Sequence, residues 1–270
     1  MNKISELTPG AVPVGFSSPS ISVVVPAKNE AKNLPHVLSK FPSWIDEVIL
    51  VDGNSTDDTV AVARSILPNI KVVGQSRKGK GAALRSGFEA SKGDIIVMID
   101  ADGSMDPGEI PAYIGALLTG ADFVKGSRFM QGGGTDDMEW YRRLGNWGFV
   151  KLVTWRFGGN YSDLCYGYSA FWRDALTRLY LEKDDGFEIE TSMNVQALQA
   201  GLTVHEVPSQ EAPRIHGVSN LRTIPDGYRV LMTILRLGTV GSGKRRHDGE
   251  ISKPGAVDSR FAGDIRDITN

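Results

Sequence analysis

The sequence contains a single cysteine, Cys165, and no apolar run long enough to cross a bilayer. One cysteine excludes a disulfide within the chain and is typical of reducing compartments. A membrane-spanning helix needs roughly 20 apolar residues, which no stretch approaches. Residues 1–20 lack an apolar core of secretory length and are rich in Pro, Gly and Ser, so a flexible leader is expected there. A cytoplasmic protein is predicted, with attachment at the cytoplasmic face of a membrane as an option.

Two common nucleotide-binding motifs are also missing. No G-x-x-x-x-G-K-[ST] loop is present, and no G-x-G-x-x-G follows the first predicted strand, which disfavours P-loop ATPases and dinucleotide-dependent dehydrogenases. The net charge of −2 provides no general attraction to nucleic acid. The length of 270 residues is enough for one large domain or two small ones.

Short apolar runs alternate with helical segments along the chain. Strands are predicted at residues 21–25, 46–51, 70–73, 95–99 and 122–125, and a later one ends at 206–208. Helices are predicted at about 27–40, from 56, at 81–91 and 111–118, and later at 140–157, from 186 and at 225–237. This alternation predicts an α/β fold, a mostly parallel sheet flanked by helices.

The stretch Asp94–Met105 (DIIVMIDADGSM) has the pattern of a buried parallel strand that ends on two aspartates. Ligands of open α/β sheets bind at the carboxyl ends of the strands. Asp100 and Asp102 are separated by one residue, so in an extended segment both side chains point to the same side. Two hard oxygen donors suit Mg²⁺ or Mn²⁺ carrying a diphosphate. An isolated Asp-x-Asp is otherwise most often a solvated loop.

Polar groups follow two further strands, at Pro26–Glu30 and at Asp52–Asn54. Because parallel strands end at one edge of the sheet, these loops and the aspartates can form one nucleotide pocket. The turn Arg77–Gly81 (RKGKG) is basic and Gly-rich, which suits contact with a phosphate or nucleobase at a helix N-terminus, or equally a solvated turn.

Five ordered motifs resemble those of family 2 glycosyltransferases, whose nucleotide-sugar domain has the Rossmann-like GT-A fold. They are VVVPAKNE, VDGNSTDDT, KGKGAALRSGF, IDADGSMDP and KGSRF, and the similarity extends over about residues 21–237. The dolichol-phosphate mannose synthase and polyprenyl-phosphate glycosyltransferase branch is the most similar. The resemblance implies a GT-A domain at 21–238, with acceptor-side elements at 140–238.

On the donor side, the resemblance places Pro26, Asn29 and Glu30 in the first nucleotide loop. It implies that Asp52 receives the base and that Lys80 provides the basic group of the third motif. Gly53 stands where the family usually has a second acid, so the identity of the donor base stays open.

At the reacting centre, the resemblance places Asp100 near the ribose and Asp102 on the metal, with Asp100 and Ser104 as further candidate metal ligands. Arg128, in Gly126–Phe129 (GSRF), matches an arginine that faces the transferred sugar and the acceptor phosphate. A surface salt bridge is the alternative for this arginine, but an arginine at the end of a buried strand is seldom there for packing.

The acceptor side is predicted to begin with Gln131–Met138 (QGGGTDDM), a loop whose three glycines offer a hinge for a lid. The helix Trp140–Phe157 combines three tryptophans with basic residues, a pattern that suits a membrane interface. The resemblance implies that Arg142 on this helix holds the phosphate of a lipid acceptor. A helix packed in the protein core is the alternative.

A hydroxyl acceptor would need a general base, for which Asp163, Glu188 and Glu190 are candidates, whereas a phosphate acceptor would need none. Residues 214–221 (RIHGVSNL) match a loop that closes over the donor diphosphate, with Arg214 as a bidentate phosphate ligand. His216 is a more speculative substrate contact, since a lone histidine is more often structural.

The final predicted helix carries Arg222, Arg229 and Arg236 at seven-residue intervals. A dozen residues rise only about 18 Å, too short to span a bilayer. The helix and the following Lys244–Arg246 suit peripheral attachment to a membrane, and a docked helix or a subunit interface, hence a homo-oligomer, is the alternative. The polar, Gly-rich tail 239–270 is expected to be disordered.

The sequence thus predicts an enzyme that transfers mannose or glucose, with inversion, from GDP-mannose or UDP-glucose to a polyprenyl or dolichyl phosphate, using Mg²⁺ or Mn²⁺. Transfer to a hydroxyl of a soluble small molecule or glycan is the alternative. A nucleotide-sugar-binding subunit without turnover ranks below both, because the Asp-x-Asp and the arginines are intact.

Overall fold

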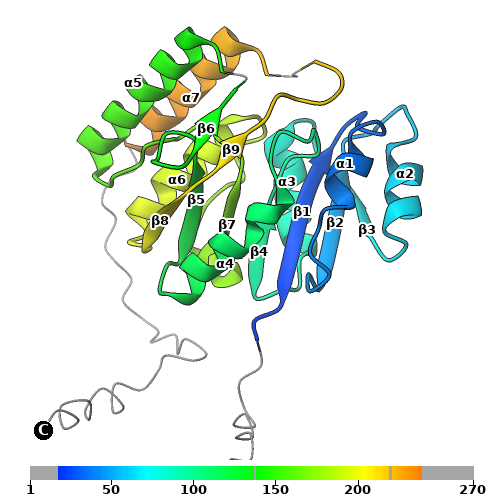
Figure 1. The fold of residues 1–270 in the computed structure, drawn as a ribbon. Coiled ribbons are helices and arrows are strands. Elements are labelled where there is room, and N and C mark those ends of the chain that lie inside the picture. Colours follow the sequence, from blue (N-terminus) through cyan, green and yellow to red (C-terminus); the bar gives the residue numbers. More distant parts are fainter. Residues whose placement is uncertain (1–17, 137, 219–220, 239–270) are drawn as a thin grey trace, which may run out of the picture. The chain divides into compact units, whose positions relative to one another are not determined.

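A seven-stranded sheet with the order β3-β2-β1-β4-β7-β5-β8 runs through the molecule (Figure 1). The computed structural model describes residues 18–136, 138–218 and 221–238. The parallel strands are β1 (Ile21–Ala27), β2 (Glu47–Asp52), β3 (Lys71–Gly74), β4 (Ile95–Met98), and the pair β5 (Phe123–Ser127) and β8 (Val204–Pro208). The predicted α/β fold with a mostly parallel sheet is confirmed.

One strand of this sheet escaped prediction. β7 (Ser169–Trp172) lies between β4 and β5 and is antiparallel to both. Its four residues show no alternation of apolar and polar side chains that would distinguish a strand from a loop. β7 is a strand because it pairs with β4 and β5, which are distant in the chain. The residues of β7 alone do not indicate this pairing.

The Gly-rich loop predicted as a hinge is partly paired. β6 (Gly134–Thr135) lies within Gln131–Met138 and forms a separate two-stranded sheet with β9 (Gln210–Glu211). Gly132 has φ 92°, in the region that favours glycine. The loop is therefore hydrogen-bonded to the segment that follows β8, whereas a freely moving lid would have no such pairing.

Helices cover both faces of the sheet. They are α1 (Leu34–Leu38), α2 (Thr59–Ile66), α3 (Lys80–Ala90), α4 (Ile110–Leu118), α5 (Trp140–Phe157), α6 (Glu188–Gln199) and α7 (Thr223–Leu237), with 3-10 turns at Pro107–Glu109 and Arg173–Arg178. α1 is shorter than predicted, and the predicted start at residues 27–30 was wrong. Asn29 has φ 58°, a left-handed conformation that a right-handed helix cannot contain.

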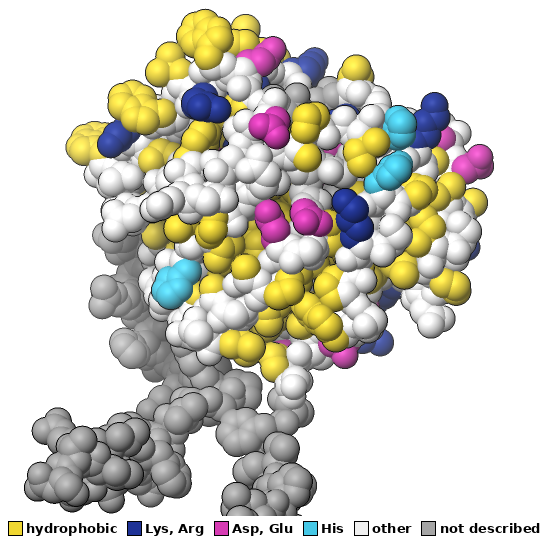
Figure 2. Space-filling view, in the orientation of Figure 1, with side chains coloured by type: hydrophobic (Ala, Val, Ile, Leu, Met, Phe, Trp, Pro, Cys, Tyr) yellow, Lys and Arg dark blue, Asp and Glu magenta, His cyan; other side chains and the backbone are white. Residues whose placement is uncertain are grey.

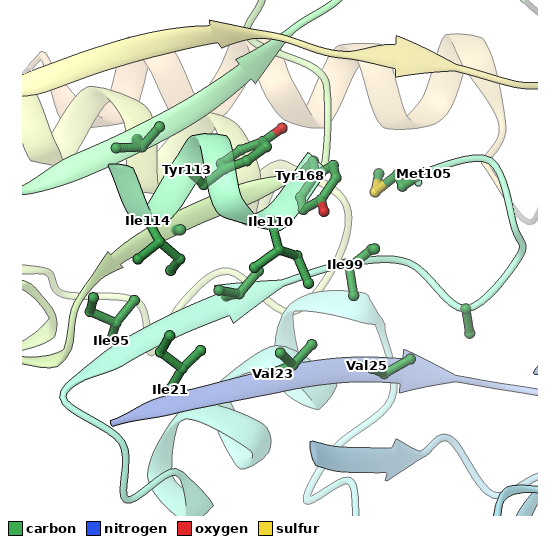
Figure 3. Packing of buried hydrophobic residues seen from close by; sticks show 14 of the residues in the cluster. Ile21, Val23, Val25, Ile95, Ile99, Met105, Ile110, Tyr113, Ile114 and Tyr168 are labelled. Atoms are coloured by element: carbon green, nitrogen blue, oxygen red, sulfur yellow. The ribbon is translucent and has the colours of Figure 1, made fainter. Parts of the chain in front are cut away.

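Alternate residues of the strands supply two cores. Val23 and Val25 of β1 pack with Ile110 and Tyr113 of α4 on one face, as the close view shows (Figure 3). Val24 packs on the other face with residues of α3 and α6. At roughly 25 cal/mol per Å² of apolar surface removed from water, these two layers supply the main stabilisation of the sheet.

A third core holds the C-terminal helices beside the sheet. It joins Val153 of α5, Val195 of α6 and Ile234 of α7, all nearly inaccessible to solvent. No helix in the described part of the chain is long and apolar enough to cross a membrane. The leader and the disordered tail were predicted for segments that, apart from residues 18–20, lie outside the described residues.

Candidate active site

The pocket opens where the strand order reverses. β1 and β4 are neighbours, but the chain leaves β1 towards β2 on one side and places β4 on the other, which leaves a crevice at the carboxyl ends of the strands. A pocket of about 410 Å³ lies there. Ten of the predicted site residues line it: Pro26, Glu30, Lys80, Asp100, Asp102, Ser104, Arg128, Arg142, Glu190 and Arg214.

Asp102 and Arg214 meet at the centre of the pocket. The Asp102 carboxylate accepts hydrogen bonds from the Ser104 backbone N–H at 3.0 Å and hydroxyl at 2.7 Å, which fixes its orientation. Arg214 lies 3.1 Å from the other Asp102 oxygen and 2.9 Å from Glu30. Asp102 follows β4, Glu30 follows β1 and Arg214 follows β8. These ion pairs therefore join three loops that are far apart in the sequence.

The second charge cluster surrounds the first residue of α3. Lys80 lies 2.7 Å from Asp100 and 2.6 Å from Glu190. Burial alone would lower the pKa of the Lys80 ammonium, but the attraction of both carboxylates outweighs it and raises the pKa. Burial raises the pKa of Asp100 to about 6, with Asp102 and Glu190 adding to this rise and Lys80 opposing it.

The third cluster fixes Arg128. Its guanidinium donates to both oxygens of Asp163, at 2.7 and 2.9 Å, and to Glu211 at 3.0 Å, and it lies over the Tyr166 ring. Burial opposes ionisation of both partners, yet their mutual attraction raises the pKa of Arg128 and lowers that of Asp163. Asp163 is therefore an ion-paired carboxylate that faces Arg128.

Three basic residues of the pocket wall have no such partner. Within the described ranges, no carboxylate forms an ion pair with Lys28, Lys78 or Arg142, although all three line the pocket. Their charges are free to attract an anionic ligand. Lys28 directly follows β1, Lys78 lies in the loop between β3 and α3, and Arg142 lies in the first turn of α5.

Five predicted site residues lie outside the pocket lining. Asn29 accepts a hydrogen bond from the Thr56 N–H at 2.8 Å, and Asp52 accepts from the Ser55 N–H at 3.3 Å, so both shape loops. Asp163 is buried behind Arg128. Glu188 accepts from the Gly186 N–H at 2.9 Å. His216 borders a second pocket of about 440 Å³, with its ring 5.9 Å from that of His36.

The oxygen donors suit a divalent cation that brings most of its own ligands. No cluster of three or more His, Cys, Asp or Glu residues that could hold a metal occurs in the part of the chain that the structure describes. Asp102 and Ser104 present hard oxygens side by side at the pocket wall. Magnesium typically takes one or two carboxylates and completes its shell with water and substrate phosphates, which fits this arrangement.

Several pocket residues were not predicted, among them Glu211, Gln75, Tyr166 and Phe187. Glu211 lies on β9, three residues beyond the end of β8, and only its contact with Arg128 shows its place. Gln75 directly follows β3, a strand end that carried no predicted ligand. The rule that found the other strand ends would have found Gln75 as well.

Comparisons with known proteins agree with this geometry. The model of the family described as glycosyl transferase family 2 matches residues 22–180. Glycosyltransferase AglJ of Haloferax volcanii is 31% identical over 222 residues, which cover 80% of this chain and 71% of the relative. Polyprenol monophosphomannose synthase of Mycolicibacterium smegmatis is 30% identical over 220 residues, which cover 74% and 80%.

A solved structure shares the fold. Glucosyl-3-phosphoglycerate synthase of Mycobacterium tuberculosis, in complex with Mn²⁺, UDP-glucose and phosphoglyceric acid, aligns with a TM-score of 0.62 at 26% identity, covering 83% of this chain and 81% of that one. Another crystal of the same synthase holds Mg²⁺ and UDP. The family match covers more than half of the chain, and the pocket lies where this fold binds nucleotides. The chain therefore belongs to glycosyl transferase family 2 and is an enzyme that transfers sugar from a nucleotide-sugar.

Proposed function

We propose that this enzyme transfers a hexose, mannose or glucose, from GDP-mannose or UDP-glucose to the phosphate of a polyprenyl or dolichyl phosphate. Mg²⁺ or Mn²⁺ would assist, as the metal-bound crystals of the synthase suggest. The name of the mycobacterial polyprenol relative supports a lipid-phosphate acceptor. The observation that carries the proposal is Arg142, a pocket arginine without a carboxylate partner among the described residues, on a helix whose outer side is apolar.

The position of Arg142 suits an acceptor phosphate at the mouth of the pocket. On the outer side of α5, Trp140, Leu144 and Trp147 are exposed, with 75%, 58% and 59% of their surfaces accessible. A guanidinium binds phosphate bidentately, and the apolar side chains on the outer side of the same helix can receive the isoprenoid chain. Both parts of an amphipathic acceptor then find a matching surface on one helix.

The carboxylates in and behind the pocket wall favour an acceptor that is already an anion. Glu190 is paired with Lys80, and Asp163 and Glu211 with Arg128. A carboxylate held against a cation is a weak general base, because protonation would break the pair. A phosphate oxygen attacks without losing a proton, so the acceptor we propose requires no base.

The proposed reaction is a single displacement with inversion at the anomeric carbon. An acceptor phosphate oxygen forms the new bond as the bond to the nucleoside diphosphate breaks. Asp102 and Ser104 would hold the cation, which when bound neutralises charge on the diphosphate. Arg214 would stabilise the departing phosphate, and Arg142 would orient the attacking one. The Arg128 side chain is 1% accessible and donates to Asp163 and Glu211, whereas that of Arg214 is 19% accessible and can turn to a phosphate. We therefore assign Arg128 the shaping of this wall and Arg142 the acceptor phosphate.

We further propose peripheral contact with an anionic membrane. α5 carries four basic residues and no acidic one, and its exposed stripe includes Trp155, 80% accessible. The neighbouring α7 exposes Ile224, Tyr228 and Met232 at helical spacing. Apolar and basic side chains share this surface, which lies over α5 and α7 (Figure 2). Such a composition suits the headgroup region of a bilayer, at its cytoplasmic face.

A soluble acceptor is the second candidate. It is favoured by the similarity to glucosyl-3-phosphoglycerate synthase, whose structure holds UDP-glucose and phosphoglyceric acid. In that case the anionic group of a small molecule would occupy the Arg142 side of the pocket, and a hydroxyl would attack. Glu190 is then the carboxylate in the pocket that could accept the proton.

To test the acceptor, purified enzyme is incubated with Mg²⁺ or Mn²⁺, a short polyprenyl phosphate, and labelled GDP-mannose or UDP-glucose in parallel reactions. We expect label in the organic phase with one donor, and at least about a tenfold loss with Arg142→Ala. Arg173→Ala, an exposed arginine outside the pocket, is the matched control. Labelled product that stays in water with phosphoglyceric acid as acceptor, and none in the organic phase, would refute the lipid acceptor.

A further inference from the structure

Residues 181–186, the segment that leads into α6, hold the first turn of α3 at the pocket wall. The backbone N–H groups of Gly81 and Ala82 donate to the Asp185 carbonyl at 2.8 and 3.2 Å. Free N–H groups at a helix N-terminus can bind a phosphate. Here the chain itself uses two of them, so this helix end joins two segments that are distant in the sequence.

The contact is made between backbones. A Cβ at position 79 would lie 2.0 Å from the Asp185 carbonyl oxygen, and one at position 81 would lie 2.1 Å from that of Asp184. Gly79 also has φ 118°, in the region that favours glycine. Arg85 adds a side-chain contact, because its guanidinium donates to the Leu181 carbonyl at 2.9 Å and binds the Asp185 carboxylate. A shift of residues 181–186 would therefore move the first turn of α3 as well.

Three residues of the pocket lining flank this contact. Lys80 is the first residue of α3, Phe187 directly precedes α6, and Glu190 lies in the first turn of α6. The Lys80 ammonium lies 2.6 Å from Glu190 and 5.7 Å from the centre of the Phe187 ring. Both distances depend on how the first turns of α3 and α6 are placed relative to each other, and residues 181–186 fix that placement.

Asp184 links this contact to a third helix. Its side chain is 1% accessible and lies outside the pocket lining. One carboxylate oxygen accepts from the Ser192 hydroxyl of α6 at 2.6 Å, and the other pairs with Arg236 in the last turn of α7. The Asp184 carbonyl accepts from Arg85 of α3. The contacts of one buried residue thus join α3, α6 and α7.

Lys80 balances carboxylates that would otherwise repel an anionic substrate. Asp100, Asp102 and Glu190 all line the pocket, and Lys80 lies within 2.7 Å of the first and 2.6 Å of the last. At the effective dielectric constant near a protein surface, one uncompensated carboxylate close to a bound diphosphate weakens its binding roughly tenfold. Displacement of the ammonium would therefore lower the affinity for anions and leave that for uncharged ligands unaltered.

We propose that Asp184 is a positioning residue of the transfer reaction, which together with Arg236 holds residues 181–186 against α3 and so keeps Lys80 on Asp100 and Glu190. Asp184 acts through Lys80 and not on the substrate. α7, which lies outside the pocket lining, thereby contributes to binding of the donor. The inference rests on the nucleotide-sugar donor of the family and is independent of the proposed acceptor.

The test compares ligands that differ in charge. Calorimetry with Mg²⁺ measures the dissociation constants of UDP and GDP directly, and those of uridine and guanosine, which carry no phosphate, by displacement. Asp184→Asn retains an acceptor for Ser192 but loses the charge that holds Arg236. We expect its affinity for the preferred diphosphate to fall roughly tenfold, and that for the corresponding nucleoside to stay within about twofold.

A second variant breaks the pair from its more accessible side. The Arg236 side chain is 38% accessible, and Arg236→Gln should give the same pattern as Asp184→Asn, whereas Arg236→Lys keeps the charge and should bind like the wild type. Arg229→Ala is the matched control, because Arg229 lies on the same helix and pairs with Asp226 at 3.2 Å. Its loss should change neither affinity. Circular dichroism would verify that each variant is folded.

A double-variant cycle shows whether Asp184 acts through Lys80. Lys80→Gln alone should weaken binding of the diphosphate. Adding Asp184→Asn to Lys80→Gln should cause no further loss, because two residues that act through one contact are not additive.

Three results would overturn the inference. They are a folded Asp184→Asn or Arg236→Gln variant that binds the diphosphate as tightly as the wild type, an equal loss for nucleoside and diphosphate, and a further loss when Asp184→Asn is added to Lys80→Gln. The second result would indicate general loosening of the pocket, and the third a role that does not involve Lys80. All three are measured without an acceptor, so they are distinguishable from failure of the proposed lipid acceptor.

Discussion

Six basic side chains line the pocket wall, and in the described part of the chain three of them are ion-paired with carboxylates and three are not. Lys80, Arg128 and Arg214 each contact two carboxylates, while Lys28, Lys78 and Arg142 have no ion-pair partner among the described residues. The ion pairs hold loops from distant strands together, and the three cations without an ion-pair partner supply charge for an anionic ligand. Residue type alone does not distinguish the two groups, because arginines at strand ends can serve either purpose.

Asp102→Ala should remove the carboxylate proposed to hold the cation. We expect kcat/KM to fall at least about 100-fold, because charge on the leaving diphosphate loses its stabilisation. Calorimetry should also show that Mn²⁺ no longer strengthens nucleotide binding. Asp174→Ala, an exposed aspartate on the 3-10 turn Arg173–Arg178, serves as the control. A fully active Asp102 variant would exclude the metal assignment.

At the scale of single elements, α5 differs from an ordinary surface helix. Its inner side contributes Val153 to the third core, while Trp140, Leu144, Trp147 and Trp155 face solvent. A helix that is apolar on both sides is normally covered on both. Clusters of exposed apolar side chains of this kind mark interaction surfaces. The proposed cover for this side of α5 is the lipid headgroup region.

Substituting Trp140 and Trp147 together by Ser should weaken membrane binding. We expect sedimentation with vesicles of equal parts phosphatidylglycerol and phosphatidylcholine to fall at least about fivefold, because amphipathic rings contribute most at headgroup depth. Binding of the wild type should decrease with salt, since the exposed basic residues of α5, Arg143, Lys151 and Arg156, attract anionic lipid.

The control for this prediction is Trp44→Ser. Trp44 is 47% accessible and lies in the loop between α1 and β2, away from α5. Its removal should leave sedimentation unchanged. Wild-type protein that stays in the supernatant at low salt would contradict the membrane surface, whereas a shift to dimers in light scattering that is lost in the tryptophan double variant would identify a second copy as the cover.

At the scale of the whole molecule, the ion pair of Arg128 and Asp163 joins elements that are distant in the sequence. Arg128 follows β5, Asp163 precedes β7, and Glu211 lies on β9. The side chains of Arg128 and Asp163 are 1% and 0% accessible. Removal of one charge therefore leaves the other buried and uncompensated, which is far more costly than loss of a surface pair.

Asp163→Asn should lower the free energy of unfolding by about 3–5 kcal/mol, measured by urea denaturation at pH 7. Asp58→Asn, on an exposed aspartate that makes no side-chain cap, should change it by less than about 0.5 kcal/mol. Because folding lowers the pKa of Asp163, its contribution is present at neutral pH. It is lost in acid, as the pH falls from the ordinary aspartate pKa of about 3.9 through the lower folded-state pKa. A variant as stable as the wild type would show that the pair is not needed for folding.

The sequence by itself determined the α/β alternation, the strand ends that carry Asp100, Asp102 and Glu30, and the family. These depend on local periodicity and on residues close together in the chain. Only the tertiary structure decided that β7 is a strand, that Asp163 lies behind Arg128, and that Gln75 and Glu211 reach the pocket. Each of these depends on contacts between residues more than 20 positions apart, and a pattern read along the chain carries no record of such contacts.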